Sequence, residues 1–196
     1  MTAAGWRQLA VVSVTDPAAA ARALIALRPP REALWTALVL VAVLNTLIFV
    51  LSGMLVPGPS PLPAMLSSPV IYFAIVAGGL VLTVYAIFWT GRAFGGQGAV
   101  EDILVLIVWM QSLRVLVQVA ALVLVLTAPL LSALLVFAAA LIGLYMLVHF
   151  IDQAHRFGSP GRAIGVLIAS VLAIVLGLSV LLSLLAGPIL GVSSHV

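Results

Sequence analysis

One arginine, Arg114, interrupts a long apolar stretch near its middle. A central arginine costs about 2.5–3.5 kcal/mol on membrane-insertion scales, and such charges usually face a bundle interior or a wet cavity. Gln111 and Gln118 share its helix face through the i−3 and i+4 spacings, and Asn45 lies near the middle of another apolar stretch. The pattern favours a polar clamp between helices or snorkelling of Arg114 to one face, and an anion or lipid-headgroup site is the alternative.

A second group, His149, Asp152, His155 and Arg156, lies where another apolar stretch ends. The i, i+3 and i, i+4 spacings resemble those of metal ligands, but the group offers only two imidazoles and one carboxylate. It also lacks the glutamate of a zinc protease motif. We therefore predict a hydrogen-bonded cluster at the membrane interface and no metal site.

A glycine-rich loop is the third candidate, with the residues Gly91, Arg92, Gly95, Gly96, Gly98 and Asp102. Glycine-rich loops can hold phosphate, but here no strand precedes the loop, no Lys-Ser/Thr pair follows it, and the glycine spacing fits neither nucleotide motif. A tight turn into a helix fits better, because Glu101 and Asp102 would favour that helix's dipole. No Ser–His–Asp set or carboxylate pair can be assembled at membrane depth, so we predict no catalytic residue.

The elements that position these residues are apolar. The 196-residue chain is 65% hydrophobic and 7% charged, with a mean hydropathy of +1.37, whereas soluble domains carry about 25% charged residues. A membrane helix needs about 20 mostly apolar residues, and lipid offers no hydrogen bonds to an open backbone. We predict an all-α polytopic membrane protein, a bundle of five transmembrane helices. The expected spans are Leu34–Val56, Pro69–Thr90, Glu101–Thr127, Leu130–Ile151 and Ala163–Ala186.

The joins between the spans follow from proline. Pro57, Pro59, Pro61 and Pro63 separate the first two spans, and Gly187-Pro188 ends the last. The join at Ala128-Pro129 is so short that spans three and four must form an antiparallel hairpin or one re-entrant unit. The five-helix domain is thus expected over 34–190, followed by a short non-cytoplasmic tail, 191–196.

The segment 1–33 has no continuous apolar run like that of a signal peptide. Asp16-Pro17 is a favourable helix start, since aspartate accepts free N–H groups and proline suits the first position. The helix would continue to Leu27 and stop at Pro29-Pro30. We expect it to lie on the membrane surface.

The basic residues indicate orientation. The chain has eight arginines and no lysine, and all except Arg114 fall on one side when five spans alternate: Arg7, Arg22, Arg28, Arg31, Arg92, Arg156 and Arg162. The positive-inside rule then predicts a cytoplasmic N-terminus and a periplasmic C-terminus. The absence of lysine and the bias towards Ala, Leu, Val and Arg suggest a GC-rich bacterial genome, so we expect the protein in a bacterial inner membrane.

The arginines are dispersed, so we expect no nucleic-acid partner. Cysteine is absent, which excludes thiolate chemistry and Cys-ligated metal sites.

The loop Gly91-Arg92-x-x-Gly95-Gly96-x-Gly98-x-x-Glu101-Asp102, running into a span with Trp109, resembles the Yip family, the Ypt/Rab-interacting-protein membrane domain that also occurs in bacteria. Asp16-Pro17 before an Ala-rich segment and five spans agree with it. The resemblance covers nearly the whole chain and implies a five-helix domain, no established enzymatic activity, no cofactor, and a role through partners.

Two functional interpretations remain. In the first, the chain is a non-catalytic membrane protein that binds a membrane-protein partner or a second copy, as an accessory or assembly subunit within the lipid bilayer. In the second, it is a small transporter, channel or lipid-binding protein built around Arg114. Inverted repeats and paired broken helices, which are typical of transporters, are not evident.

Overall fold

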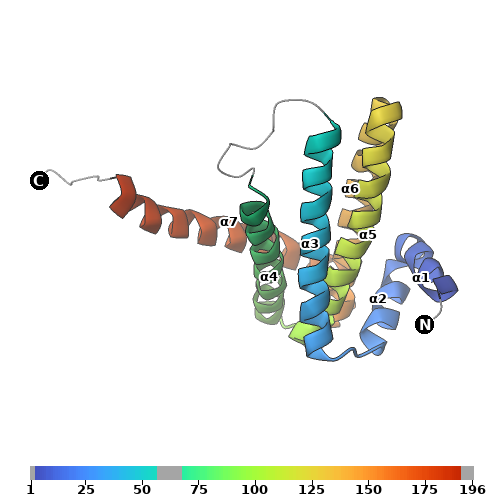
Figure 1. Ribbon diagram of the computed structural model, residues 1–196. Helices are drawn as coiled ribbons and strands as arrows, with labels where there is room; N and C mark the ends of the chain where they lie inside the picture. The colour runs from blue at the N-terminus through green and yellow to red at the C-terminus, as the bar shows by residue number, and fades with distance from the viewer. Residues whose placement is uncertain (1–2, 57–67, 191–196) are drawn as a thin grey trace, which may run out of the picture.

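The computed structural model describes residues 3–56 and 68–190, without the side chains of Ala3 and of 181–190. These residues are helical throughout, apart from short connections (Figure 1). The helices are α1 (Ala3–Thr15), α2 (Pro17–Ala26), α3 (Arg31–Leu55), α4 (Pro69–Ala93), α5 (Val100–Thr127), α6 (Pro129–His155) and α7 (Pro160–Leu190). Five of them, α3 to α7, are long and apolar enough to cross a membrane. The predicted all-α class and the five spans are confirmed.

The helices begin and end close to the predicted limits, because proline and turn residues set them. Pro69, Pro129 and Pro160 each occupy a first helical position, where the missing N–H costs nothing. One limit was wrong: α7 continues through Gly187-Pro188 to Leu190. A proline so near a helix end removes only one or two backbone hydrogen bonds, and this loss does not end the helix here. The predicted proline loop (57–63) and the tail (191–196) lie outside the described residues.

α5 and α6 form the antiparallel hairpin that the short join at Ala128-Pro129 allowed, and not a re-entrant unit. The Ser132 hydroxyl donates a hydrogen bond to the carbonyl oxygen of Ala121 at 2.8 Å, which fixes the register of the two helices next to the turn. Counting seven residues away from this pair on each helix places Arg114 opposite Ala139. The hairpin therefore carries both candidate groups of α5 and α6 on adjacent helices.

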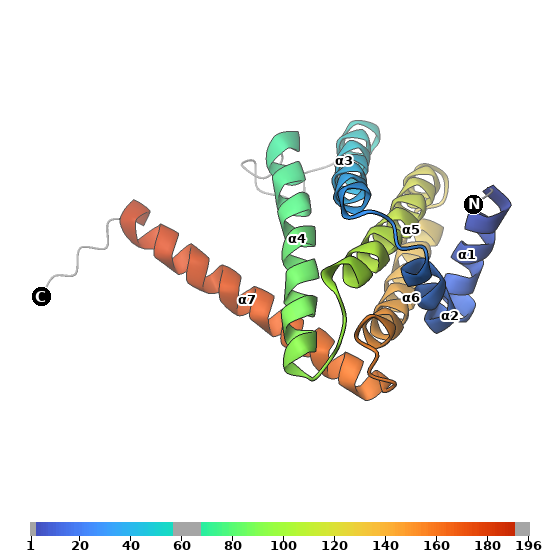
Figure 2. The ribbon, with the colours of Figure 1, turned by 90° about the horizontal axis from the view of Figure 1, so that it is seen from below.

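α1 and α2 form a second hairpin against the side of α5 and α6 (Figures 1 and 2). The predicted start of α2 is confirmed, since the Asp16 carboxylate accepts a hydrogen bond from Ala19 N at 2.9 Å. Ala20, Ala21 and Leu24 are buried against the bundle. Small side chains on this face let α2 approach α6 closely. The structure thus shows α2 packed on the bundle; its place at a membrane surface stays a prediction.

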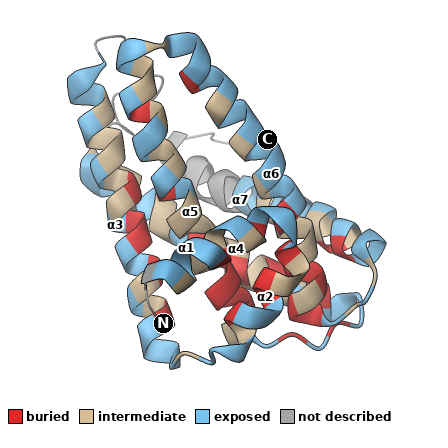
Figure 3. Cartoon of the chain, turned by 90° about the vertical axis from the view of Figure 1, so that its right-hand side faces the viewer, coloured by how far each residue is buried: buried red, intermediate tan, exposed pale blue. Residues whose placement is uncertain are grey.

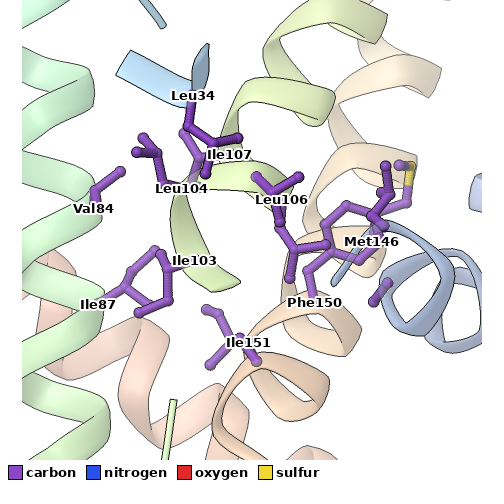
Figure 4. Close-up of a cluster of buried hydrophobic side chains, with 14 of the residues drawn as sticks. Leu34, Val84, Ile87, Ile103, Leu104, Leu106, Ile107, Met146, Phe150 and Ile151 are labelled. Atoms are coloured by element: carbon purple, nitrogen blue, oxygen red, sulfur yellow. The ribbon is translucent and has the colours of Figure 1, made fainter. Parts of the chain in front are cut away.

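The buried residues gather at one end of the bundle, where the α2–α3, α4–α5 and α6–α7 connections lie (Figure 3). We call this end the glycine-loop end. Its core brings together side chains of four helices (Figure 4), with Leu34 of α3, Val84 and Ile87 of α4, Ile103, Leu104 and Ile107 of α5, and Met146, Phe150 and Ile151 of α6. The other end carries mostly exposed and half-buried apolar residues, as expected of surfaces that face lipid.

α7 packs on α4 and α6 only through its first part, where Ala163 and Val166 are fully buried. The Thr90 and Ser170 hydroxyls lie 2.6 Å apart and link α7 to α4. Beyond this point α7 runs away from α3, α5 and α6 at a large angle (Figures 1 and 2). From Val171 to Val180 nine of ten residues are exposed, so this stretch of α7 covers no other helix that the structure describes.

Candidate functional site: the glycine loop and the end of α6

The glycine loop between α4 and α5 is held by backbone hydrogen bonds at both of its ends. Gly96 N donates to the carbonyl oxygen of Gly91 at 2.8 Å, which closes the loop on the last turn of α4. Gln97 N donates to the carbonyl oxygen of His155 at 3.1 Å, which ties the loop to the end of α6. Gly95 has φ +82°, a left-handed conformation that glycine adopts without strain. The loop is therefore a fixed turn, as predicted.

The His155 side chain fills the space inside this loop. It is 1% exposed, and its Nε2 lies 3.1 Å from the carbonyl oxygen of Ile87 in α4. A carbonyl oxygen only accepts hydrogen bonds, so Nε2 carries the proton and donates. In the neutral ring Nδ1 is then an acceptor, and this atom is buried without a hydrogen-bond partner among the described residues. The Phe157 ring stacks on the imidazole at 5.3 Å between centroids.

Three glycines of the loop are required by this ring. A Cβ added at Gly91 would overlap with Cε1 and Nε2 of His155. A Cβ at Gly96 would come within 2.6 Å of Nδ1, and one at Gly98 would lie 2.7 Å from Ala154 O and 2.9 Å from Nδ1. We call His155 with Gly91, Gly96 and Gly98 the histidine interlock. The glycine loop and the end of α6, which were predicted as two separate candidates, thus form one site.

Asp152 shapes the chain as it leaves α6. It is 5% exposed, and its Oδ1 accepts a hydrogen bond from Ser159 N at 2.8 Å, just before α7 begins. The backbone turns through Arg156, which has φ +57°, and Gly158, which has φ +60°. The Asp152 carboxylate therefore connects the end of α6 to the start of α7 and is not directed at His155.

Charged side chains around the interlock join the connections at this end. Asp102 Oδ2 accepts a hydrogen bond from Ala99 N at 3.3 Å and lies 3.9 Å from Arg156 Nη2. Arg31 and Glu101 form an ion pair at 3.7 Å, and the Arg22 guanidinium donates to Gln153 Oε1 at 3.3 Å. Exposed pairs like these stabilise a fold by only about 0–1 kcal/mol each. What they show is position, since they place three arginine-bearing segments at one end of the molecule. Arg92 lies over the Phe88 ring at 5.8 Å.

The four residues predicted to cluster at the end of α6 have separate surroundings. His155 enters the interlock, Asp152 contacts Ser159, and Arg156 approaches Asp102. His149 packs edge-on against Tyr145 of its own helix at 4.7 Å. Within residues 3–56 and 68–190 no group of three His, Asp or Glu side chains could hold a metal ion.

The four polar residues within the membrane spans are also not joined by hydrogen bonds. Asn45 is 5% exposed, and its Nδ2 donates to Val41 O of its own helix at 2.7 Å. Gln118 Oε1 is buried without a partner, and Gln111 is half-buried. Arg114 is exposed and makes no hydrogen bond or ion pair within the described part of the chain.

One polar contact was missed by sequence analysis. The Trp109 indole Nε1–H donates to the Ser13 hydroxyl at 2.8 Å, and Trp6 stacks on Trp109 at 5.6 Å. Ser13 is fully buried and Leu9 is 6% exposed, so Trp6, Leu9 and Ser13 form one contact face on α1. Their i, i+3, i+7 spacing was the available signal, but α1 lacks the capping residue that marked α2.

Comparison with known proteins identifies the family. Residues 11–181 match the Yip1 domain, a range that includes the histidine interlock, Arg114 and the end of α1. No curated protein and no solved structure matches the chain. Because the match covers most of the sequence, from within α1 to the exposed half of α7, this multi-pass membrane protein belongs to the Yip1 domain family.

Proposed function

We propose that this chain is a non-catalytic Yip-type membrane protein that acts by binding a protein partner, as an accessory or assembly subunit of a membrane complex. The observation that carries the proposal is the histidine interlock. The His155 side chain fills the inside of the glycine loop. The loop is therefore held in one conformation and presents an ordered outer edge. Arg92 and Gln97 are exposed along that edge.

The site's chemistry agrees with binding more than with turnover. The His155 imidazole is enclosed, and the Asp152 carboxylate is engaged by a backbone N–H. A general acid or base must come within hydrogen-bond reach of a substrate, which these positions do not favour. The cavity beside the interlock is lined by apolar side chains only, among them Ile87, Ile103, Met110, Phe150 and Ile151.

Site-specific photo-crosslinking in native membranes tests this proposal. We expect a crosslinker at Gln97, on the exposed edge of the loop, to capture one protein in a fixed ratio to the chain. A crosslinker at Val123, which is 60% exposed on the apolar surface of α5, is the matched control and should capture lipid. If Gln97 captures the same spread of products as Val123, the loop is not a partner site and the proposal is wrong.

A second candidate function, lipid or anion handling, is favoured by the exposed and unpaired Arg114. It predicts that the chain purified in mild detergent retains an anionic lipid or small anion, and that Arg114→Leu releases it while the fold is kept. A chain that instead elutes with a stoichiometric protein supports the first proposal.

A further inference from the structure

Arg114 lies on the inward side of α5, not on its lipid-facing side. At about 100° per residue, it falls within about 40° of Ile103, Ile107 and Met110 around the helix. Those residues face α4 and α6 at the glycine-loop end, where they line the apolar cavity. The strongly exposed residues of α5, Leu116, Val119 and Val123, lie on the other side. Arg114 is therefore exposed because no helix covers this face at its depth.

The helices that could cover the face diverge there. α7 extends away from α5 and α6, and α4 is inclined to them and follows α3 instead (Figure 2). Ala139 of α6 lies opposite Arg114 in the hairpin register, and Gly143 follows one turn away. A Cβ added at Gly143 would meet no atom within 4 Å, so there is open space beside α6 at this level. Small residues of this kind let another helix approach closely.

The chain itself cannot neutralise Arg114. Of its five side-chain carboxylates, Glu32, Glu101, Asp102 and Asp152 lie at the glycine-loop end. The fifth, Asp16, lies at the α1–α2 turn, where it caps α2 by accepting a hydrogen bond from Ala19 N. Arg114 is about 20 Å from both ends of α5 at about 1.5 Å per residue. α7 has Arg162 as its only charged residue, so a swing of α7 into the gap would bring no carboxylate. A second copy in the same orientation would bring four of its carboxylates at the depth of the glycine-loop end, and its Asp16 is engaged in capping α2.

A lipid phosphate at its ordinary depth in the bilayer is also too far away. Half of the hydrocarbon core measures about 15 Å. An extended arginine side chain, a zigzag of six bonds of roughly 1.5 Å each, reaches about 7 Å, which leaves about 8 Å to the headgroups. An unpaired cation at this depth is costly, so a partner at the same depth would be strongly favoured. Gln118 Oε1, one turn from Arg114, is a buried acceptor that also lacks a partner.

From this geometry we propose that the open face of α5 and α6 around Arg114 and Gly143 receives a transmembrane helix of a different membrane protein, one that carries an aspartate or glutamate near mid-membrane. The carboxylate pairs with Arg114, and the helix backbone packs beside Gly143. This inference rests on the proposed function and specifies the chemistry of its partner within the membrane.

The test uses the full chain in lipid vesicles and a synthetic Leu/Ala transmembrane peptide with one central glutamate. The chain has no cysteine, so a single Gln97→Cys substitution carries a donor dye, and energy transfer to a labelled peptide reports binding. We expect the glutamate peptide to bind about tenfold more tightly than the same peptide with a central glutamine. Moving the glutamate two turns towards either end should remove the advantage.

Variants of the protein complete the test. Arg114→Leu should abolish the preference for glutamate, Arg114→Lys should keep it, and Arg114→Glu should transfer it to a peptide with a central lysine. Arg162→Leu, which removes an arginine outside the membrane core, should change nothing. Equal binding of the glutamate and glutamine peptides, or a preference that survives Arg114→Leu, overturns the inference. Dependence of the preference on anionic lipid in the vesicles also overturns it.

The two proposals fail separately. If Gln97 crosslinks to one protein but Arg114→Leu alters neither that product nor peptide binding, the proposed function stands and the mid-membrane carboxylate is wrong. If the charge preference holds but Gln97 captures no defined protein, the partner does not use the glycine loop, and that part of the proposed function is wrong.

Discussion

At the scale of single residues, the histidine interlock explains why glycine is needed at positions 91, 96 and 98. We expect Gly91→Ala to lower the free energy of unfolding by about 1–3 kcal/mol, because its Cβ would overlap the enclosed His155 ring. Gly78→Ala is the matched control on the same helix, since a Cβ there meets nothing within 4 Å. The control should leave stability unchanged or raise it by up to about 1 kcal/mol. Denaturant titration in detergent micelles measures both, and equal effects would contradict the interlock.

A residue-scale coupling follows from the same contact. We expect His155→Ala to cost about 2–5 kcal/mol, as for a large side chain removed from a core, because it empties the loop and frees Ile87 O. Gly91→Ala should then cost less in the His155→Ala background, since the atoms it would overlap are gone. A double-mutant cycle should show a coupling of about 0.5–3 kcal/mol. Additive effects would mean that the two residues act independently.

At the scale of elements, one part-buried hydrogen bond and one ring stack join α1 to α5. Ser13→Ala removes the acceptor of the Trp109 N–H, and such a loss costs about 0.5–1.5 kcal/mol. We therefore expect trypsin to cut after Arg7 about two- to tenfold faster in the variant, as α1 detaches more often. Thr15→Ala is the control, because the Thr15 hydroxyl bonds only to Val11 O within α1. Equal cleavage rates in the two variants would show that the Trp109 bond does not hold α1.

The elements also show what a single sequence can predict. Span length, apolar composition and proline placed the five long helices, and the Asp16-Pro17 cap placed α2, because these signals act within one element. The pairing of His155 with Gly91 depends on how α4 and α6 are set side by side, and periodicity carries no information about that. Arg114 stood out as an anomaly in the sequence, but its uncovered face depends on the directions of α4 and α7.

At the scale of the whole molecule, the contacts of Arg22 in α2, Arg31 at the start of α3 and Arg156 at the end of α6 lie at one end. The positive-inside rule predicts that this glycine-loop end faces the cytoplasm.

Since the chain has no cysteine, single cysteines can be introduced without removing others. Gln97→Cys and Arg162→Cys should react with a membrane-impermeant maleimide only after the membrane is opened. Ser194→Cys should react in cells whose outer membrane has been made permeable while the inner membrane is intact. Labelling of all three from the same side would contradict a single crossing of the membrane by α7, while the reverse pattern would keep that crossing and invert the protein. In that case the exposed edge of the glycine loop would meet its partner outside the cytoplasm.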